Sequence, residues 1–147
     1  MGTLAKKLEA EVSAWPNVSV APHRFAAKEF RFQKAEIGHV HFWGDVDIPF
    51  PRAVRDVLLA EGRAQRHRWL PESGWVTFPL RNHADVERAI WLMRLSYLRY
   101  ALKGSADAER MLCDESERLQ LSPELKKLMS QFLPRQSSDL KTAHSAA

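Results

Sequence analysis

Two histidines in the middle of the chain have a residue type and a spacing suited to proton transfer or metal binding. The segment 37–43 is Ile-Gly-His-Val-His-Phe-Trp. Successive side chains of a β-strand point to opposite faces, so this alternation places His39 and His41 on one face, together with Ile37 and Trp43. Histidine exchanges a proton near neutral pH and is the commonest metal ligand. The pair marks a candidate site, although alternation is equally typical of a strand whose polar residues face solvent.

A third histidine lies in a predicted β-hairpin further along the chain. Residues 64–69 and 74–80 form its two arms, because Pro and Ser residues between them favour a turn. Gln65, His67 and Trp69 then share one face of the first arm. We predict that this histidine and the earlier pair approach one another around a common cavity.

A metal centre is the rival chemistry for the three histidines. Catalytic zinc sites use three protein ligands and leave one coordination position open. A carboxylate such as Asp45 or Asp47 would then converge on the imidazoles as a further ligand. We predict instead a site without metal or other cofactor.

His23 and His83 lie at segment boundaries and are predicted to be solvated or capping residues.

The elements that must position these residues alternate between strands and helices. Strands are predicted at 18–21, 26–33 and 36–43 in addition to the hairpin arms, and helices at 3–14, 52–61, 83–102, 105–118 and 123–132. The apolar stripe of the helix 83–102 predicts that it packs across the sheet. We therefore predict an α+β fold. It is a single domain over residues 1–133, with an antiparallel sheet of five or six strands and a disordered tail at 134–147.

Composition narrows the classes of protein that fit. A chain of 147 residues with 45% hydrophobic residues can bury a core without disulfides. The single cysteine, Cys113, forms no internal disulfide, which favours a reducing compartment, and we predict a cytoplasmic location. No segment approaches the roughly 20 apolar residues of a membrane span, so no membrane partner is predicted.

The net charge of +4 raises nucleic acid as a partner, but acidic residues are interleaved with the basic ones, which disfavours it.

Taken together, these pieces resemble the luciferase domain family, named after the luciferase of bioluminescent fungi. The matching pieces are the His39-x-His41 strand, Gly62-x-x-Gln65-Arg66-His67, Trp75 followed by Thr77-Phe78, Arg81-Asn82, and Ser96. They extend over roughly half of the chain, within a core of residues 26–102. The order and spacing of the pieces carry the resemblance, since no single piece is specific.

The resemblance implies an oxygenase-like site for a small molecule. The fungal enzyme adds dioxygen to a hydroxylated α-pyrone without flavin, haem or metal. Such chemistry needs a base that converts the substrate into an electron-rich enolate or phenolate, because singlet organic molecules react slowly with triplet oxygen. Imidazole suits this role, since its pKa lies near the working pH. The predicted catalytic residues are His39, His41 and His67.

The same resemblance suggests the residues around the substrate. The predicted substrate-binding residues are Trp43, Gln65, Arg66, Trp69 and Trp75. Arg66 would stabilise the resulting anion, and the tryptophans would line a dry pocket for a planar enolic or aromatic molecule. Ordinary core packing is the other interpretation of each tryptophan. The implied partners are this small molecule and dioxygen.

A second function, from another class, is a non-catalytic binding module. In that case the basic segment from Arg63 to Arg68 would contact an anionic partner or nucleic acid. The two functions differ in where the histidines lie, either around an apolar pocket or on an open basic surface.

Overall fold

The computed structural model describes residues 2–135, so the predicted tail at 134–147 lies almost wholly outside the described residues. The chain divides into two compact units, residues 1–98 and residues 99–147. The predicted α+β class is confirmed: one antiparallel sheet of six strands, a long helix packed on it, and further helices toward both ends. The predicted domain bounds stay a prediction.

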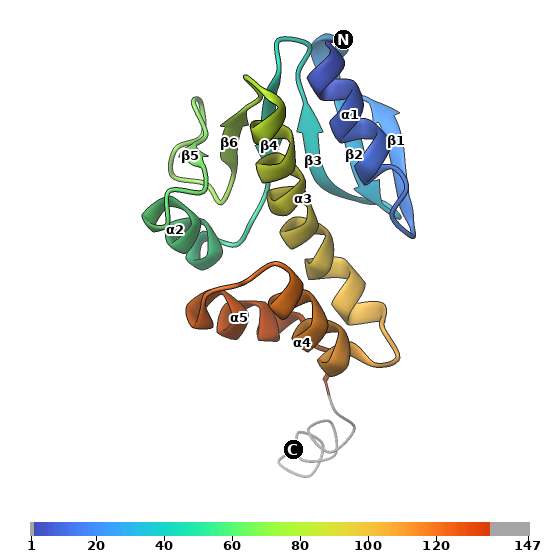
Figure 1. Cartoon of the computed structure of the whole chain (residues 1–147), viewed down its shortest axis with the longest axis vertical. Helices are drawn as coiled ribbons and strands as arrows, with labels where there is room; N and C mark the ends of the chain where they lie inside the picture. Colours follow the sequence, from blue (N-terminus) through green and yellow to red (C-terminus); the bar gives the residue numbers. More distant parts are fainter. Residues whose placement is uncertain (1, 136–147) are drawn as a thin grey trace, which may run out of the picture. The chain divides into compact units, whose positions relative to one another are not determined.

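All six strands belong to the first unit and pair in the order β1-β2-β3-β4-β6-β5 (Figure 1). They are β1 (Val18–Pro22), β2 (Lys28–Phe32), β3 (Ala35–Val40), β4 (Asp45–Ile48), β5 (Gln65–Arg66) and β6 (Val76–Pro79). Short turns join the first four strands, whereas a helix precedes the hairpin of β5 and β6. Because β6 rather than β5 lies beside β4, the second arm of the hairpin extends the sheet.

The helices lie before, between and after the strands along the chain. They are α1 (Thr3–Val12), α2 (Arg52–Ala60), α3 (His83–Gly104), α4 (Ala108–Arg118) and α5 (Pro123–Met129), with 3-10 turns η1 (Arg24–Ala26) and η2 (Ser130–Phe132). Before α3, the Asn82 side chain accepts the backbone N–H of Asp85, and the Asp85 carboxylate accepts that of Arg81. These bonds satisfy backbone donors that a helix start leaves unpaired.

One face of the sheet, called here the core face, packs against α3. Val40 pairs with Val46 and Val46 with Phe78, so these apolar side chains share this face. Gly38 lies on it as well, and a Cβ there would come within 2.6 Å of the Met93 sulfur of α3. The absence of a side chain at Gly38 therefore lets the helix approach the strand closely. Figure 1 shows α3 crossing the sheet.

A β-bulge in β3 changes the predicted alternation. Phe30 pairs with Gly38 but Arg31 pairs with Glu36, so β3 carries one extra residue between them. Ile37, predicted to share the face of His39, is instead fully buried, and Glu36 takes a place beside His39. The prediction for Ile37 was wrong because a local pattern cannot show an insertion relative to the neighbouring strand.

Four predicted strands, 26–33, 36–43, 64–69 and 74–80, are shorter than expected, and two of them end early for a clear local reason. The strand 36–43 ends at Val40, because His41 and Gly44 close a tight turn: the N–H of His41 donates to the Asp45 carbonyl, and that of Gly44 to the His41 carbonyl. The arm 64–69 ends at Arg66. Beyond it, backbone N–H groups donate to a histidine ring rather than to a neighbouring strand.

The described part of the second unit is helical. Ser122 caps α5 by accepting the backbone N–H of Leu125, and Pro123 occupies the first turn, where its missing N–H costs nothing. The buried side chains of this unit include Leu112, Leu125, Met129 and Phe132. The predicted helices at 105–118 and 123–132 are confirmed in outline.

Within residues 2–135, no helix combines the length and apolar character needed to cross a membrane.

Candidate functional site

A row of side chains crosses the face of the sheet opposite to the core face. Neighbouring strands pair Glu29 with His39, His39 with Asp47, Asp47 with Thr77, and Thr77 with Gln65. Cross-strand partners share a face, so this polar row extends across five strands. The face that carries it is called the polar face below.

Asp47 is the centre of the polar row. Its Oδ2 lies 2.7 Å from Nε2 of His41 and 3.3 Å from Nε2 of both His39 and His67. Its other oxygen, Oδ1, accepts a hydrogen bond from the Thr77 hydroxyl at 2.6 Å. All five side chains are buried. The structure therefore brings the three predicted histidines together around one carboxylate, which we call the Asp47 cluster.

The surroundings of Asp47 keep its carboxylate charged. Burial by itself would raise the pKa of this group, because a charge is costly away from water. Hydrogen bonds from His39, Thr77 and His41 outweigh burial and hold the pKa of Asp47 well below its ordinary value. The cluster thus contains a fixed negative charge at neutral pH.

His39 carries the matching positive charge. Its Nδ1 lies 3.2 Å from the Glu36 carboxylate and its Nε2 faces Asp47, so both ring nitrogens meet acceptors. Burial would lower the pKa of His39, but the hydrogen bonds with Asp47 and Glu36 outweigh it and raise the pKa to about 9. His39 is therefore an imidazolium at neutral pH. The bulge in β3 makes this possible by bringing Glu36 to the same side as His39.

His67 has one defined tautomer. Its Nδ1 accepts the backbone N–H groups of Trp69 and Leu70, each at 3.2 Å. An acceptor nitrogen carries no proton, so the proton of the neutral ring lies on Nε2, which points to Asp47. Nε2 of His67 therefore presents its hydrogen to the Asp47 carboxylate.

His41 differs from the other two histidines, because one of its nitrogens is unpaired. Nε2 donates to Asp47, whereas the buried Nδ1 has no hydrogen-bond partner among the described residues. The ring stacks on Trp43, with centroids 4.2 Å apart and planes inclined by 11°. The arrangement leaves a nitrogen lone pair available for a proton.

The predicted tryptophans surround the cluster without enclosing it. Trp75 lies 5.4 Å from His39 and 6.2 Å from His67, measured between ring centroids. Trp43 is 45% exposed and Trp69 is 63% exposed, so both rings contact the cluster at one side and solvent at the other. They form an exposed aromatic rim above buried polar groups.

The remaining predicted residues lie at the margin. Gln65 pairs with Thr77 and so shares the polar face. Arg66 is exposed, and its Nη1 donates to the Pro71 carbonyl at 3.0 Å. The assignment of substrate-binding roles to these residues and to the tryptophans stays a prediction, as do the catalytic roles of the histidines.

Sequence reasoning did not anticipate part of this site. It considered Asp47 only as an extra metal ligand, it gave no role to Glu36, and it placed His23 outside the site. His23, expected to be solvated or capping, stacks on His39 at 4.3 Å and pairs with Glu29 at 3.1 Å. Its signal in the sequence is weak, because the strand β1 and the turn η1 bring it to the site from a distant part of the chain.

Among residues 2–135, two groups of side chains have the arrangement to hold a metal ion. In each, the potential ligand atoms lie within 4.8 Å of one another: His39, His41 and Asp47 in the first group, and His23, Glu36 and His39 in the second. His67 fits less well, because its Nδ1 accepts two backbone N–H groups and its Nε2 is therefore protonated. A metal in the first group would require His39 to lose its second proton.

The fold and the cluster together define an α+β domain with a histidine–carboxylate site on the polar face of its sheet. Residues 34–96 match the family model of the Luciferase domain. The matched region contains β4, α2, β6 and all four groups that surround Asp47. No curated protein matches the chain, and no solved structure does.

Proposed function

We propose that the Asp47 cluster removes a proton from a planar enolic or phenolic molecule and promotes its reaction with dioxygen without a cofactor. The observation that carries this proposal is the position of three imidazoles around the Asp47 carboxylate, one of them with an unpaired nitrogen. The match of residues 34–96 to the Luciferase domain model supports it, because the luciferase resemblance implies addition of dioxygen to a hydroxylated α-pyrone.

His41 is the proposed general base. Asp47 accepts the hydrogen on Nε2 and so orients the ring, while Nδ1 is left to take the substrate proton. The imidazolium that forms on His41 is stabilised by the adjacent carboxylate. The buried positive charge of His39 favours the substrate anion in the same region.

The oxygen step then requires no electron donor other than the substrate. The enolate or phenolate transfers electron density to dioxygen, and a carbon–oxygen bond forms to give a peroxide anion. The proton held by His41 returns to this anion, so the product is a hydroperoxide and the ring is again neutral. Atoms and electrons balance between substrate anion, dioxygen and proton.

The exposed rings of Trp43 and Trp69 supply a surface for the flat substrate. Because Nδ1 of His41 is buried, the substrate reaches it only when neighbouring groups move. A cytoplasmic location fits this proposal, since Cys113 is an exposed free thiol of the kind that persists in a reducing compartment.

Oxygen uptake by the purified protein tests the proposal directly. A panel of hydroxylated α-pyrones and phenols is supplied to the wild-type protein, to His41→Gln and to His83→Gln. His83 is an exposed histidine that contacts Lys7 and is a matched control. We expect uptake that falls by about two to four orders of magnitude in His41→Gln and is unchanged in His83→Gln. Equal rates in all three proteins, or no uptake with any compound, would contradict the proposal.

The alternative of a basic interaction surface receives less support from the geometry. Arg63 lies over the Trp91 ring, Arg66 donates to Pro71, and Arg68 is 3.7 Å from Asp45. The three guanidinium groups therefore have separate contacts and share no partner. A nucleic-acid surface at Arg63–Arg68 stays a prediction.

A further inference from the structure

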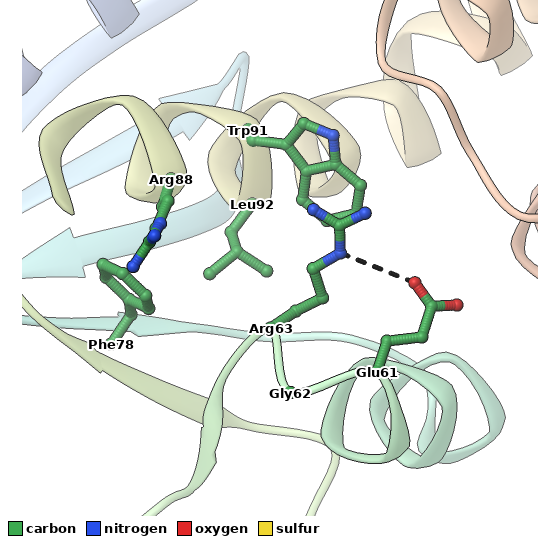
Figure 2. Close-up of a pocket in the computed structure, with 7 residues that line it drawn as sticks. All are labelled: Glu61, Gly62, Arg63, Phe78, Arg88, Trp91 and Leu92. Carbon is green, nitrogen blue, oxygen red and sulfur yellow. Dashed lines mark hydrogen bonds and ion pairs between the residues drawn. The ribbon is translucent and has the colours of Figure 1, made fainter. Parts of the chain in front are cut away.

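A cavity of about 560 Å³ lies away from the Asp47 cluster. It is lined by residues of the α2–β5 connection, of β6 and of α3, all of them in the first unit: Glu61, Gly62, Arg63, Phe78, Arg88, Trp91 and Leu92. Figure 2 shows the side chains of Arg63 and Trp91 on one side of Leu92 and those of Arg88 and Phe78 on the other. Leu92 is almost fully buried and forms the apolar floor.

The cavity is distinct from the histidine site because the two lie on opposite faces of the sheet. Thr77 points to Asp47 on the polar face. Phe78 is the next residue of β6 and pairs with Val46, so it belongs to the core face. A ligand in the cavity therefore does not contact the Asp47 cluster.

A helix-ending turn fixes the position of Arg63. The N–H of Gly62 donates to the Leu59 carbonyl and that of Arg63 to the Leu58 carbonyl, the two bonds of a Schellman motif. Gly62 has a φ of +71°, which glycine adopts without strain. The backbone of Arg63 thus leaves α2 in one direction, toward α3.

The side chain of Arg63 is oriented as well. Its guanidinium lies 4.2 Å from the centroid of the Trp91 ring, and its Nε is 3.5 Å from the Glu61 carboxylate. Stacking on an aromatic ring holds the planar group while its edge remains available for hydrogen bonds. The side chain is 39% exposed, so an incoming anion can reach it.

Arg88 supplies a second positive charge. Its side chain is 71% exposed, and Nη1 lies 3.8 Å from Asp85, a loose ion pair. Asp85 is itself occupied by the backbone N–H of Arg81. A smaller cavity of about 170 Å³ shares Arg63, Phe78 and Arg88 and adds Arg81. Arg63 and Arg88 therefore line both cavities, and Arg81 lines the smaller one.

We propose that this cavity binds a small organic anion, whose carboxylate or phosphate group contacts Arg63 and Arg88 and whose flat apolar part lies against Phe78 and Trp91. Guanidinium groups bind both anions through paired hydrogen bonds. The cavity volume lies within the roughly 300–1,000 Å³ of small-molecule sites. The proposal goes beyond the reaction proposed for the Asp47 cluster and does not depend on it.

Ligand titration followed by NMR tests this site without any assay of oxygen chemistry. The probes are phenyl phosphate, benzoate, neutral benzyl alcohol and inorganic phosphate, each titrated to millimolar concentration. The indole N–H signal of Trp91 and the backbone signals of Gly62 and Arg63 report occupancy. We expect saturable shifts with one or both aromatic anions, weaker shifts with inorganic phosphate, and none with benzyl alcohol. Which aromatic anion binds more tightly distinguishes phosphate from carboxylate.

Variants test the role of each arginine. Arg63→Gln and Arg88→Gln are each expected to weaken the better probe roughly tenfold or more, the usual loss of a charge-assisted hydrogen bond. Arg110→Gln, at an exposed position of α4, is the control and should bind as the wild type does. The proposal is overturned if no probe shifts these signals, if benzyl alcohol binds equally well, or if inorganic phosphate binds as tightly as phenyl phosphate. Unchanged binding in both arginine variants would overturn it too.

Discussion

Asp47 accepts the hydrogen bond of one nitrogen of His41, while the other nitrogen of the same buried ring has no partner among the described residues. A buried polar atom without a hydrogen bond costs free energy, about 1–3 kcal/mol, so its retention calls for a cause. A proton acceptor for a ligand is one such cause, because the ligand supplies the missing bond. His41 is thus held by a hydrogen bond to Asp47 at Nε2 and lacks a hydrogen bond at Nδ1.

His39 makes the stability of the protein depend on pH on the alkaline side. Its pKa is raised from 6.5 to about 9 in the folded state. A raised pKa contributes stability that is fully present below pH 6.5 and is lost as the pH rises through about 9. We expect the free energy of unfolding in urea to fall between these values, and His39→Gln to flatten this part of the profile. A wild-type profile that stays level up to pH 10 would contradict the assignment.

Removal of the Thr77 hydroxyl tests how the Asp47 carboxylate is held. Thr77→Val keeps the shape of the side chain but removes the bond to Oδ1, so we expect a loss of about 1–3 kcal/mol in unfolding free energy. The pKa of Asp47 should rise in this variant. The lowered pKa of Asp47 stabilises the folded protein at pH values above 3.8, which is the ordinary pKa of this group. The variant loses part of this stability, so it should unfold at a higher pH when acid is added. An acid transition identical to that of the wild type would show that the bond contributes little.

Gly74 is predicted to tolerate no side chain. A Cβ at this position would lie 1.6 Å from the Phe50 carbonyl oxygen, so Gly74→Ala must push the loop that carries Trp75 away from Phe50. We expect a loss of about 3 kcal/mol or more, measured as a lower melting temperature. Gly104→Ala is the control, because no atom lies within 4 Å of the added carbon. Equal melting temperatures for the two variants would refute the close approach.

The tautomer of His67 distinguishes proton chemistry from metal binding. Nitrogen chemical shifts should show the proton on Nε2 and a bare Nδ1, because Nδ1 accepts two backbone N–H groups. We also expect exhaustive chelation to leave the melting temperature and any oxygen uptake unchanged. Stoichiometric zinc or iron in protein purified without added metal, together with a lower melting temperature after chelation, would favour the metal interpretation.

Patterns among residues close together in sequence were sufficient to predict most of the fold. The alternation of His39 and His41, the apolar stripe of α3 and the turn between β5 and β6 each depend on residues close together in sequence. The resemblance to the luciferase family also rested on short pieces in order, and it is confirmed over residues 34–96.

The centre of the site was not predictable in the same way. Asp47 meets Thr77, which is 30 residues further along, only because β4 and β6 pair in one register. Glu36 reaches His39 because of a bulge that depends on the partner strand. The degree to which Trp43 and Trp69 are exposed likewise depends on the path of two turns and not on the residue type.

The pairing of β4 with β6 also has a consequence for biosynthesis. Chains fold from the N-terminus as they are made, so β1 to β4 leave the ribosome before β6 has been synthesised. In that interval β4 presents an unpaired edge that carries the Asp47 carboxylate without Thr77 or His67. An unpaired strand edge is a template for pairing with another chain, whereas a charged side chain on the edge strand discourages such pairing. We expect the ionised Asp47 to protect the nascent sheet from aggregation until the hairpin arrives to complete it.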